Sequence, residues 1–166
     1  MAELTHFDET GASRMVNVSA KLATLRNAEA SGLIRMAPET LRLILDQAIS
    51  KGDVFEVARI AGIMAAKRTG DLIPLCHPIG LDSVEIRFDL LDDSTVKISA
   101  SVTVHGKTGV EMEAMTAVSV AALTLYDMVK AVDRDVVFNQ IQLESKSGGR
   151  SGDYRRRSAG VATPAS

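Results

Sequence analysis

One segment, residues 106–130, constrains the fold of this chain most strongly. It reads GKTGVEMEAMTAVSVAALTLYDMVK, and its Ala-rich apolar body is long enough for a helix of about six turns. Thr108 stands three residues before Glu111, the spacing of a capping box, which predicts that the helix begins there. Because so apolar a helix must be covered on most sides, we expect the other elements to pack around it.

Alternation of apolar and polar residues predicts strands on both sides of this helix. Residues 84–90 and 96–104 alternate clearly and are separated by a turn at residues 92–94, which predicts an antiparallel hairpin. A last strand is expected over residues 136–143. Shorter extended pieces are expected at residues 15–18 and 32–36.

Two further helices are predicted before the hairpin. Pro38 occupies a first-helical position, and we expect its helix to run until Gly52. Asp53, with Glu56 three residues later, predicts the start of a second helix over residues 54–68. That helix is apolar nearly all round and rich in small residues, so we expect it to be buried between neighbours, with another subunit as one candidate.

The order of these elements predicts an α+β protein with a ferredoxin-like sandwich, an antiparallel sheet with helices packed on one face. A chain of 166 residues is most economically one domain, expected over residues 1–158, with a disordered tail at residues 159–166.

Composition narrows the class of protein. A net charge of −2 gives no global basic field for non-specific nucleic-acid binding. The single cysteine excludes an internal disulfide and fits a reducing compartment. The N-terminus lacks the apolar core of a secretory signal, and we find no run of about eighteen apolar residues. We therefore expect a cytoplasmic protein outside the membrane.

Charged residues in the long helix leave two interpretations open. Glu111 and Glu113 are two apart and point about 200° away from each other, so they form no paired-carboxylate site. Asp127 and Lys130 can form an ordinary ion pair, or an acid and an amine whose pKa values move toward neutrality through desolvation. Since Glu113 and Asp127 lie about 21 Å apart along the axis, either the ligand is long or a second chain completes the site.

The other candidate motifs are loops. The stretch at residues 106–108 has the context of a P-loop, but position 101 is serine where that motif needs glycine, so a P-loop is rejected. Cys76 and His77 lie in a proline-bounded loop, where a substrate contact is favoured over a metal pair because adjacent residues chelate poorly. Lys51 and Lys146 can bind phosphate or be solvated loop lysines.

Three blocks of the sequence resemble one family. They are KGDVFEVARIAGIMAAKRTGDLIPLCHP, GKTGVEMEAMTAVSVAALTLYDMVKAV and KSGGRSGDY, and together they are similar to the cyclic pyranopterin monophosphate synthases, the C proteins of molybdenum cofactor biosynthesis. The resemblance spans residues 4–155. It implies a lyase that converts (8S)-3′,8-cyclo-7,8-dihydroguanosine 5′-triphosphate to cyclic pyranopterin monophosphate and diphosphate. It also implies a homohexamer, a trimer of dimers, with the active site at a subunit interface.

The same resemblance implies roles for individual residues. The catalytic residues it assigns are Asp127, Lys130 and Lys51, and the substrate-binding residues are Leu75, Cys76, His77, Met112, Glu113, Glu111, Lys146 and Arg26. Position 17 departs from the family, which commonly has aspartate where this chain has Asn17.

No metal ligand is implied, although a divalent cation such as Mg²⁺ can accompany the triphosphate. Two alternatives remain at this point. One is a non-catalytic nucleotide- or pterin-binding module of ferredoxin-like fold, and the other is a metal-dependent hydrolase that uses Cys76 and His77.

Overall fold

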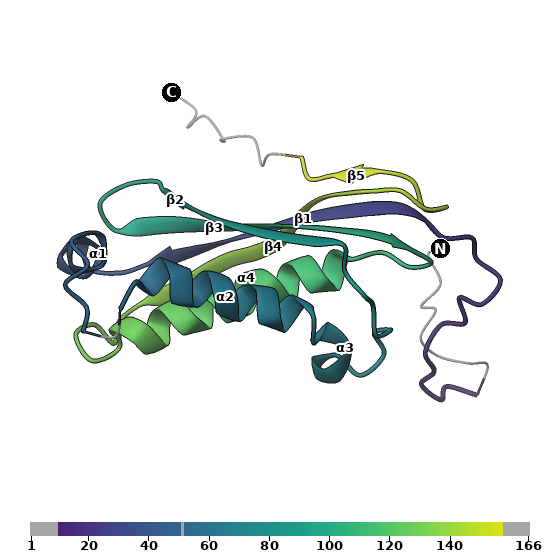
Figure 1. The fold of residues 1–166 in the computed structure, drawn as a ribbon, viewed down its shortest axis with the longest axis horizontal. Helices are drawn as coiled ribbons and strands as arrows, with labels where there is room; N and C mark the ends of the chain where they lie inside the picture. The colour runs from purple at the N-terminus through teal and green to yellow at the C-terminus, as the bar shows by residue number, and fades with distance from the viewer. Residues whose placement is uncertain (1–9, 51, 158–166) are drawn as a thin grey trace, which may run out of the picture.

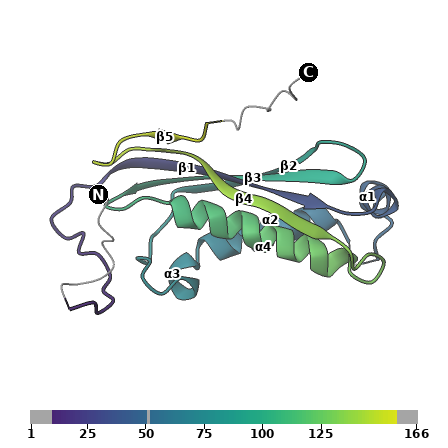
Figure 2. The ribbon, with the colours of Figure 1, turned by 180° about the vertical axis from the view of Figure 1, so that it is seen from behind.

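The computed structural model describes residues 10–50 and 52–157 as two layers, a sheet and a pair of long helices (Figure 1). The strands are β1 (Thr24–Arg35), β2 (Ser83–Leu90), β3 (Thr95–Gly106), β4 (Val137–Ser147) and β5 (Tyr154–Arg155), and the helices are α1 (Pro38–Leu45), α2 (Val54–Ala66), α3 (Thr69–Leu72) and α4 (Glu111–Val129). All strand pairs are antiparallel, in the order β2-β3-β1-β4-β5. Both views place α2 and α4 on the same face of the sheet (Figure 2). The predicted ferredoxin-like α+β sandwich is confirmed.

The predicted hairpin is confirmed as β2 and β3, whereas the first strand was placed wrongly. Residues 15–18 form no strand, and β1 begins at Thr24, well before the extended piece expected at residues 32–36. In its first half, the positions that alternate toward the helices are Thr24, Arg26 and Ala28, which give a weak apolar alternation. Pairing with β3 on one side and β4 on the other holds this stretch extended.

The helix that begins at Pro38 is shorter than predicted. It ends at Leu45 and not near Gly52, because Gln47 adopts a positive φ of 52° and the Ala48 N–H donates to the Leu43 carbonyl, closing the last turn. The start of α2 is confirmed, since the Asp53 carboxylate accepts the Glu56 N–H at 3.1 Å.

The start of α4 shows no capping box. Its N-cap is Val110, and no side chain caps the helix, while Thr108 lines a cavity beside it. By length and composition alone α4 could cross a bilayer, but 56% of that stretch is buried inside the protein, as expected for a core helix. Its buried residues lie against the sheet and α2, the packing predicted for the central segment.

Gly62 sets how closely α2 approaches α4. A Cβ at this position would lie 2.8 Å from the Ala117 carbonyl oxygen and 3.3 Å from the Ala121 Cβ, and would overlap the Ile86 side chain. The small residues predicted to permit close backbone approach therefore do so within the chain. The outer side of α2, in contrast, carries Val57, Ile60 and Met64 in exposed positions.

Replacement of Gly62 with Ala should destabilise the protein by about 1–3 kcal/mol through overpacking, although Gly-to-Ala changes inside helices usually stabilise. The free energy of unfolding in urea is the measurement. Gly80→Ala is the control, because nothing lies within 4 Å of an added Cβ there. A Gly62→Ala protein as stable as the wild type would show that the two helices can move apart at no cost.

Candidate active site

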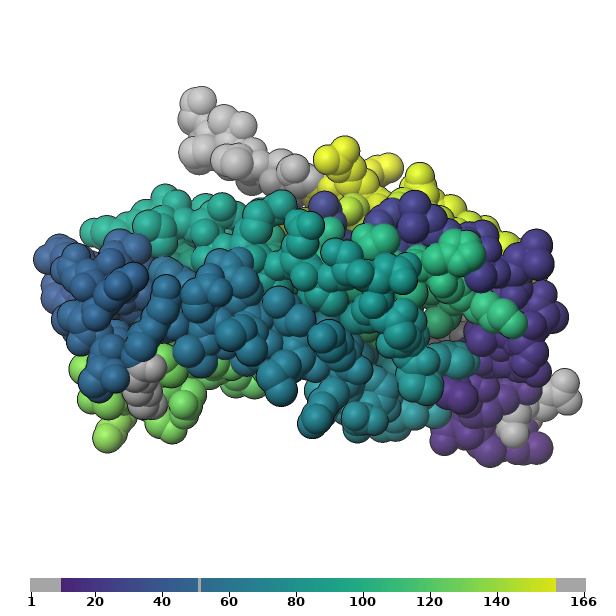
Figure 3. Space-filling model, viewed as in Figure 1, coloured from purple at the N-terminus to yellow at the C-terminus, as the bar shows by residue number. Residues whose placement is uncertain are grey.

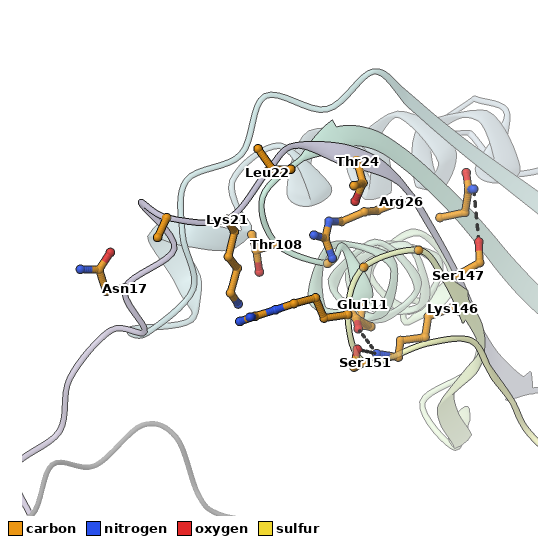
Figure 4. A pocket seen from close by; sticks show the side chains of 16 residues that line it. Asn17, Lys21, Leu22, Thr24, Arg26, Thr108, Glu111, Lys146, Ser147 and Ser151 are labelled. Carbon is orange, nitrogen blue, oxygen red and sulfur yellow. Dashed lines mark hydrogen bonds and ion pairs between the residues drawn. The ribbon is translucent and has the colours of Figure 1, made fainter.

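A cavity of about 840 Å³ lies at the end of the sheet where β3 leads into α4 (Figure 4). Its walls come from the N-terminal arm, the start of β1, the first turn of α4 and the glycine-rich loop after β4. The polar and charged residues among its lining are Asn17, Lys21, Thr24, Arg26, Asn27, Thr108, Glu111, Lys146, Ser147, Arg150 and Ser151. Four segments distant in sequence therefore meet here.

Lys146 is held in this cavity by two partners. It pairs with Ala28 across β4 and β1, a register that directs it to the helix-covered side of the sheet. Its Nζ donates to the Ser151 Oγ at 2.6 Å and lies 3.5 Å from the Glu111 Oε1 (Figure 4). The amine is thus oriented before any ligand arrives.

Arg26 ties β1 to the turn before α4. Its Nε donates to the Gly106 carbonyl at 2.9 Å and its Nη2 to the Lys107 carbonyl at 3.3 Å. Gly149, with a φ of +82°, packs so closely on the guanidinium that an added Cβ would overlap Nη1. The glycine-rich loop therefore needs glycine both for its backbone conformation and for this contact.

The cavity carries more positive than negative charge. Its lining includes four cationic side chains, Lys21, Arg26, Lys146 and Arg150, and one carboxylate, Glu111. This arrangement suits a polyanion such as a polyphosphate. Lys21 and Arg150 were not predicted; Arg150 lay within the quoted glycine-rich block, whereas nothing in the sequence distinguished Lys21.

Two contacts hold the N-terminal arm against the site. The Lys107 Nζ donates to the Ser19 carbonyl at 3.0 Å, and the His77 Nε2 lies 2.8 Å from the Val16 carbonyl oxygen. Asn17 lies between these contacts and lines the cavity. The short strand predicted around it is instead an irregular segment that forms one wall.

Glu113, two residues after Glu111 on α4, is buried and is not among the residues that line the cavity; its charge acts on Cys76 in the loop that follows α3. The exposed fraction of Glu113 is only 3%. Burial raises its pKa to about 7, against a hydrogen bond from its own backbone that lowers it, and the Glu111 charge raises it further. Burial, with a contribution from the Glu113 charge, also raises the pKa of the Cys76 thiol. Glu113 can therefore exchange a proton near neutral pH.

Of the predicted loop residues, Cys76 lies near this carboxyl group, since the Glu113 charge acts on its thiol. Leu75, Cys76 and His77 are all partly exposed, and Met112 is 37% exposed. Across the described residues, no group of three or more His, Cys, Asp or Glu side chains is placed to hold a metal ion. A hydrolase built on Cys76 and His77 therefore has no complete ligand set in this part of the chain.

Asp127 and Lys130 lie at the opposite end of α4, about 24 Å from Glu111 along the helix axis. Their carboxylate and amine are 2.6 Å apart, with 59% and 52% of the side chains exposed. The hydrogen bond that the Lys130 amine donates to the Asp127 carboxylate raises the pKa of Lys130. The pair is therefore not desolvated in the single chain, which has the ordinary ion pair of the two interpretations. Lys51 lies outside the described residues.

Comparison with a family model and comparison with individual proteins indicate the same family. Residues 15–149 match the MoaC family. The chain is 64% identical over 159 residues to cyclic pyranopterin monophosphate synthase 1 of Mycobacterium tuberculosis, covering 96% of this chain and 94% of that protein. Cyclic pyranopterin monophosphate synthases of Parvibaculum lavamentivorans and Streptomyces griseus are each 57% identical, over 93% and 92% of this chain and 98% and 86% of their own lengths.

Stability should depend on pH through Glu113. Because its pKa is raised on folding, the stabilising contribution is complete below pH 4.5 and is lost as pH rises through about 7. Relative to Glu113→Gln, the free energy of unfolding of the wild type should fall by on the order of 3 kcal/mol across this range. Urea unfolding at several pH values measures it. Glu85→Gln, at an exposed carboxylate, should leave the slope unchanged; an equal slope in Glu113→Gln would contradict the assignment.

Proposed function

The chain belongs to the MoaC family, and we propose that it converts (8S)-3′,8-cyclo-7,8-dihydroguanosine 5′-triphosphate to cyclic pyranopterin monophosphate and diphosphate in molybdenum cofactor biosynthesis. The names of relatives that align over nearly the whole chain support this reaction. The observation in the molecule that carries it is the cavity with four cationic side chains beside a buried carboxyl group of raised pKa. A non-catalytic binding module has no need of such a proton-exchanging group.

The geometry suggests where each part of the substrate binds. Its triphosphate is bound by Lys146 and Arg26, with Lys21 and Arg150 as further cations. Its ring system lies toward Glu113 and the Cys76–His77 loop, where a carboxyl group of pKa about 7 can give or take a proton. Opening and rebuilding the rings requires proton transfers but no redox step. A divalent cation such as Mg²⁺ can enter with the triphosphate.

The last step transfers the α-phosphorus. A sugar hydroxyl attacks this phosphorus while its proton passes to a base, and the bond to the bridging oxygen breaks, so that diphosphate leaves. Asp127 and Lys130 form the proton-transfer centre in this proposal, and Lys51 joins the phosphate ligands. Since Asp127 lies about 24 Å from Glu111 on the same helix, a second subunit brings its own Asp127 and Lys130 to the cavity.

An apolar surface on the helical layer supports assembly into the homohexamer, a trimer of dimers. Its residues are Val57, Ile60 and Met64 on α2 and Leu123 on α4, which are 38%, 57%, 52% and 57% exposed. In Figure 3 the outward side of α2 lies open on the face toward the viewer. Contact with another subunit would bury these side chains and, near the end of α4, desolvate Asp127 and Lys130. The cytoplasm, where nucleotide precursors are available, is the proposed location.

Asp127→Asn and Lys130→Ala should each lower turnover of the cyclic dihydroguanosine triphosphate by at least about 100-fold, since a proton-transfer group contributes that much. Folding should be nearly unaffected, because an exposed pair at this spacing stabilises by only about 0.2–0.5 kcal/mol. Product formation and thermal unfolding are measured together. Glu56→Gln, in the matched Glu56–Arg59 pair of α2, is the control. Full turnover by Asp127→Asn would show that this pair is not the proton-transfer centre. Nucleotide binding by the wild type without any product formation would support the binding module instead.

Complementation tests the shared site. Asp127→Asn and Lys146→Ala proteins, each inactive, are unfolded together, refolded as a mixture and assayed. With random assembly, about one quarter of sites take an intact Lys146 from one subunit and an intact Asp127 from another, so about a quarter of wild-type activity should return. Each variant refolded alone is the control. A mixture as inactive as its components would contradict a site built from two chains.

A further inference from the structure

Among the described residues that line the cavity, Glu111 is the one carboxylate, and it lies in the space assigned to phosphates. An anion at this position repels the anionic ligand and competes with it for the cationic side chains. Glu111 is the first residue of α4, and a negative charge is favourable at the start of any helix. That effect alone does not require the side chain to turn toward Lys146.

Two contacts place the Glu111 carboxylate there. Its Oε1 lies 3.5 Å from the Lys146 Nζ, and both side chains are partly buried, with exposed fractions of 30% for Glu111 and 20% for Lys146. The carboxylate also lies across Gly109, where an added Cβ would overlap Oε2. The Lys146 amine itself also donates to the Ser151 Oγ at 2.6 Å. Lys146 is therefore a cation already shared between an anion and a hydroxyl group.

We propose that Glu111 competes with the diphosphate product for Lys146 and so promotes its release. The inference rests on the proposed function, because it assumes that the cavity holds the phosphates. When a phosphate recruits Lys146, the Glu111 carboxylate loses its partner and faces an additional anion. The resulting loss of affinity applies to triphosphate and diphosphate alike. The substrate offsets it through contacts of its ring system, whereas free diphosphate has no such contacts.

Glu111 takes no part in the bonds that form or break. The hydroxyl oxygen binds the α-phosphorus, the bridging oxygen departs with diphosphate, and the proton goes to another base. Glu111 acts through Lys146 and is a positioning residue. It matters most after the chemical step, when product release can limit turnover.

The test is the binding of inorganic diphosphate, measured by calorimetry on the full chain at fixed salt concentration. Glu111→Gln should bind diphosphate about tenfold more tightly than the wild type, since partly exposed charges at this separation are screened by water. Glu111→Asp retains the charge and should stay within about threefold of the wild type. Glu85→Gln removes one exposed charge from β2, outside the cavity, and should change nothing. Inhibition of turnover by added diphosphate should strengthen by the same factor.

The outcomes separate this inference from the function it rests on. Two results together would overturn the competition but leave the phosphate site in place. They are unchanged or weaker diphosphate binding by Glu111→Gln, and wild-type diphosphate binding that is weakened in Lys146→Ala. Absence of diphosphate binding in every variant would overturn the phosphate site itself. In the Lys146→Ala background the gain from Glu111→Gln should shrink; an undiminished gain would show that Glu111 does not act through Lys146.

Discussion

The packing of α4 between the sheet and α2 is the contact on which the rest of the molecule depends. Small residues allow it: Gly62 lets α2 approach the Ala117 backbone, and the face of α4 toward the sheet is largely alanine and valine. Close approach excludes water from the sides of α4 that face the sheet and α2, while Leu123 stays exposed on its outer side. Polar chemistry is therefore confined to its two ends and to the segments that meet there.

Those two ends have different environments. At the start of α4, the arm, β1 and the loop after β4 converge, so Glu111 is half-buried among cations and Glu113 is fully covered. At the far end, Asp127 and Lys130 remain in water in the single chain. The same helix thus has a desolvated carboxyl group at its start and an exposed ion pair at its far end, with about 24 Å between Glu111 and Asp127. Because this distance is too long for one reacting centre, it favours the proposed active site shared between subunits.

Much of the candidate site was accessible from the sequence because its residues lie in recognisable blocks. Arg26, Glu111 and Lys146 were predicted and do lie in one cavity. Lys21 was missed because a lysine in an irregular arm carries no local pattern. Its role depends on contacts such as that of Lys107 with Ser19, which join residues far apart in the chain.

The sequence by itself determined the fold class, the hairpin, the start of α2 and the family, since these follow from periodicity, capping residues and contiguous blocks. Only the tertiary structure decided the length of β1, whose weak alternation is overridden by pairing on both sides. The tertiary structure also decided the orientation of the Glu111 side chain, which a capping box would have turned back toward the start of the helix. The carboxylate lies beside Lys146 instead, because the antiparallel register of β1 and β4 brings that amine to the first turn of α4.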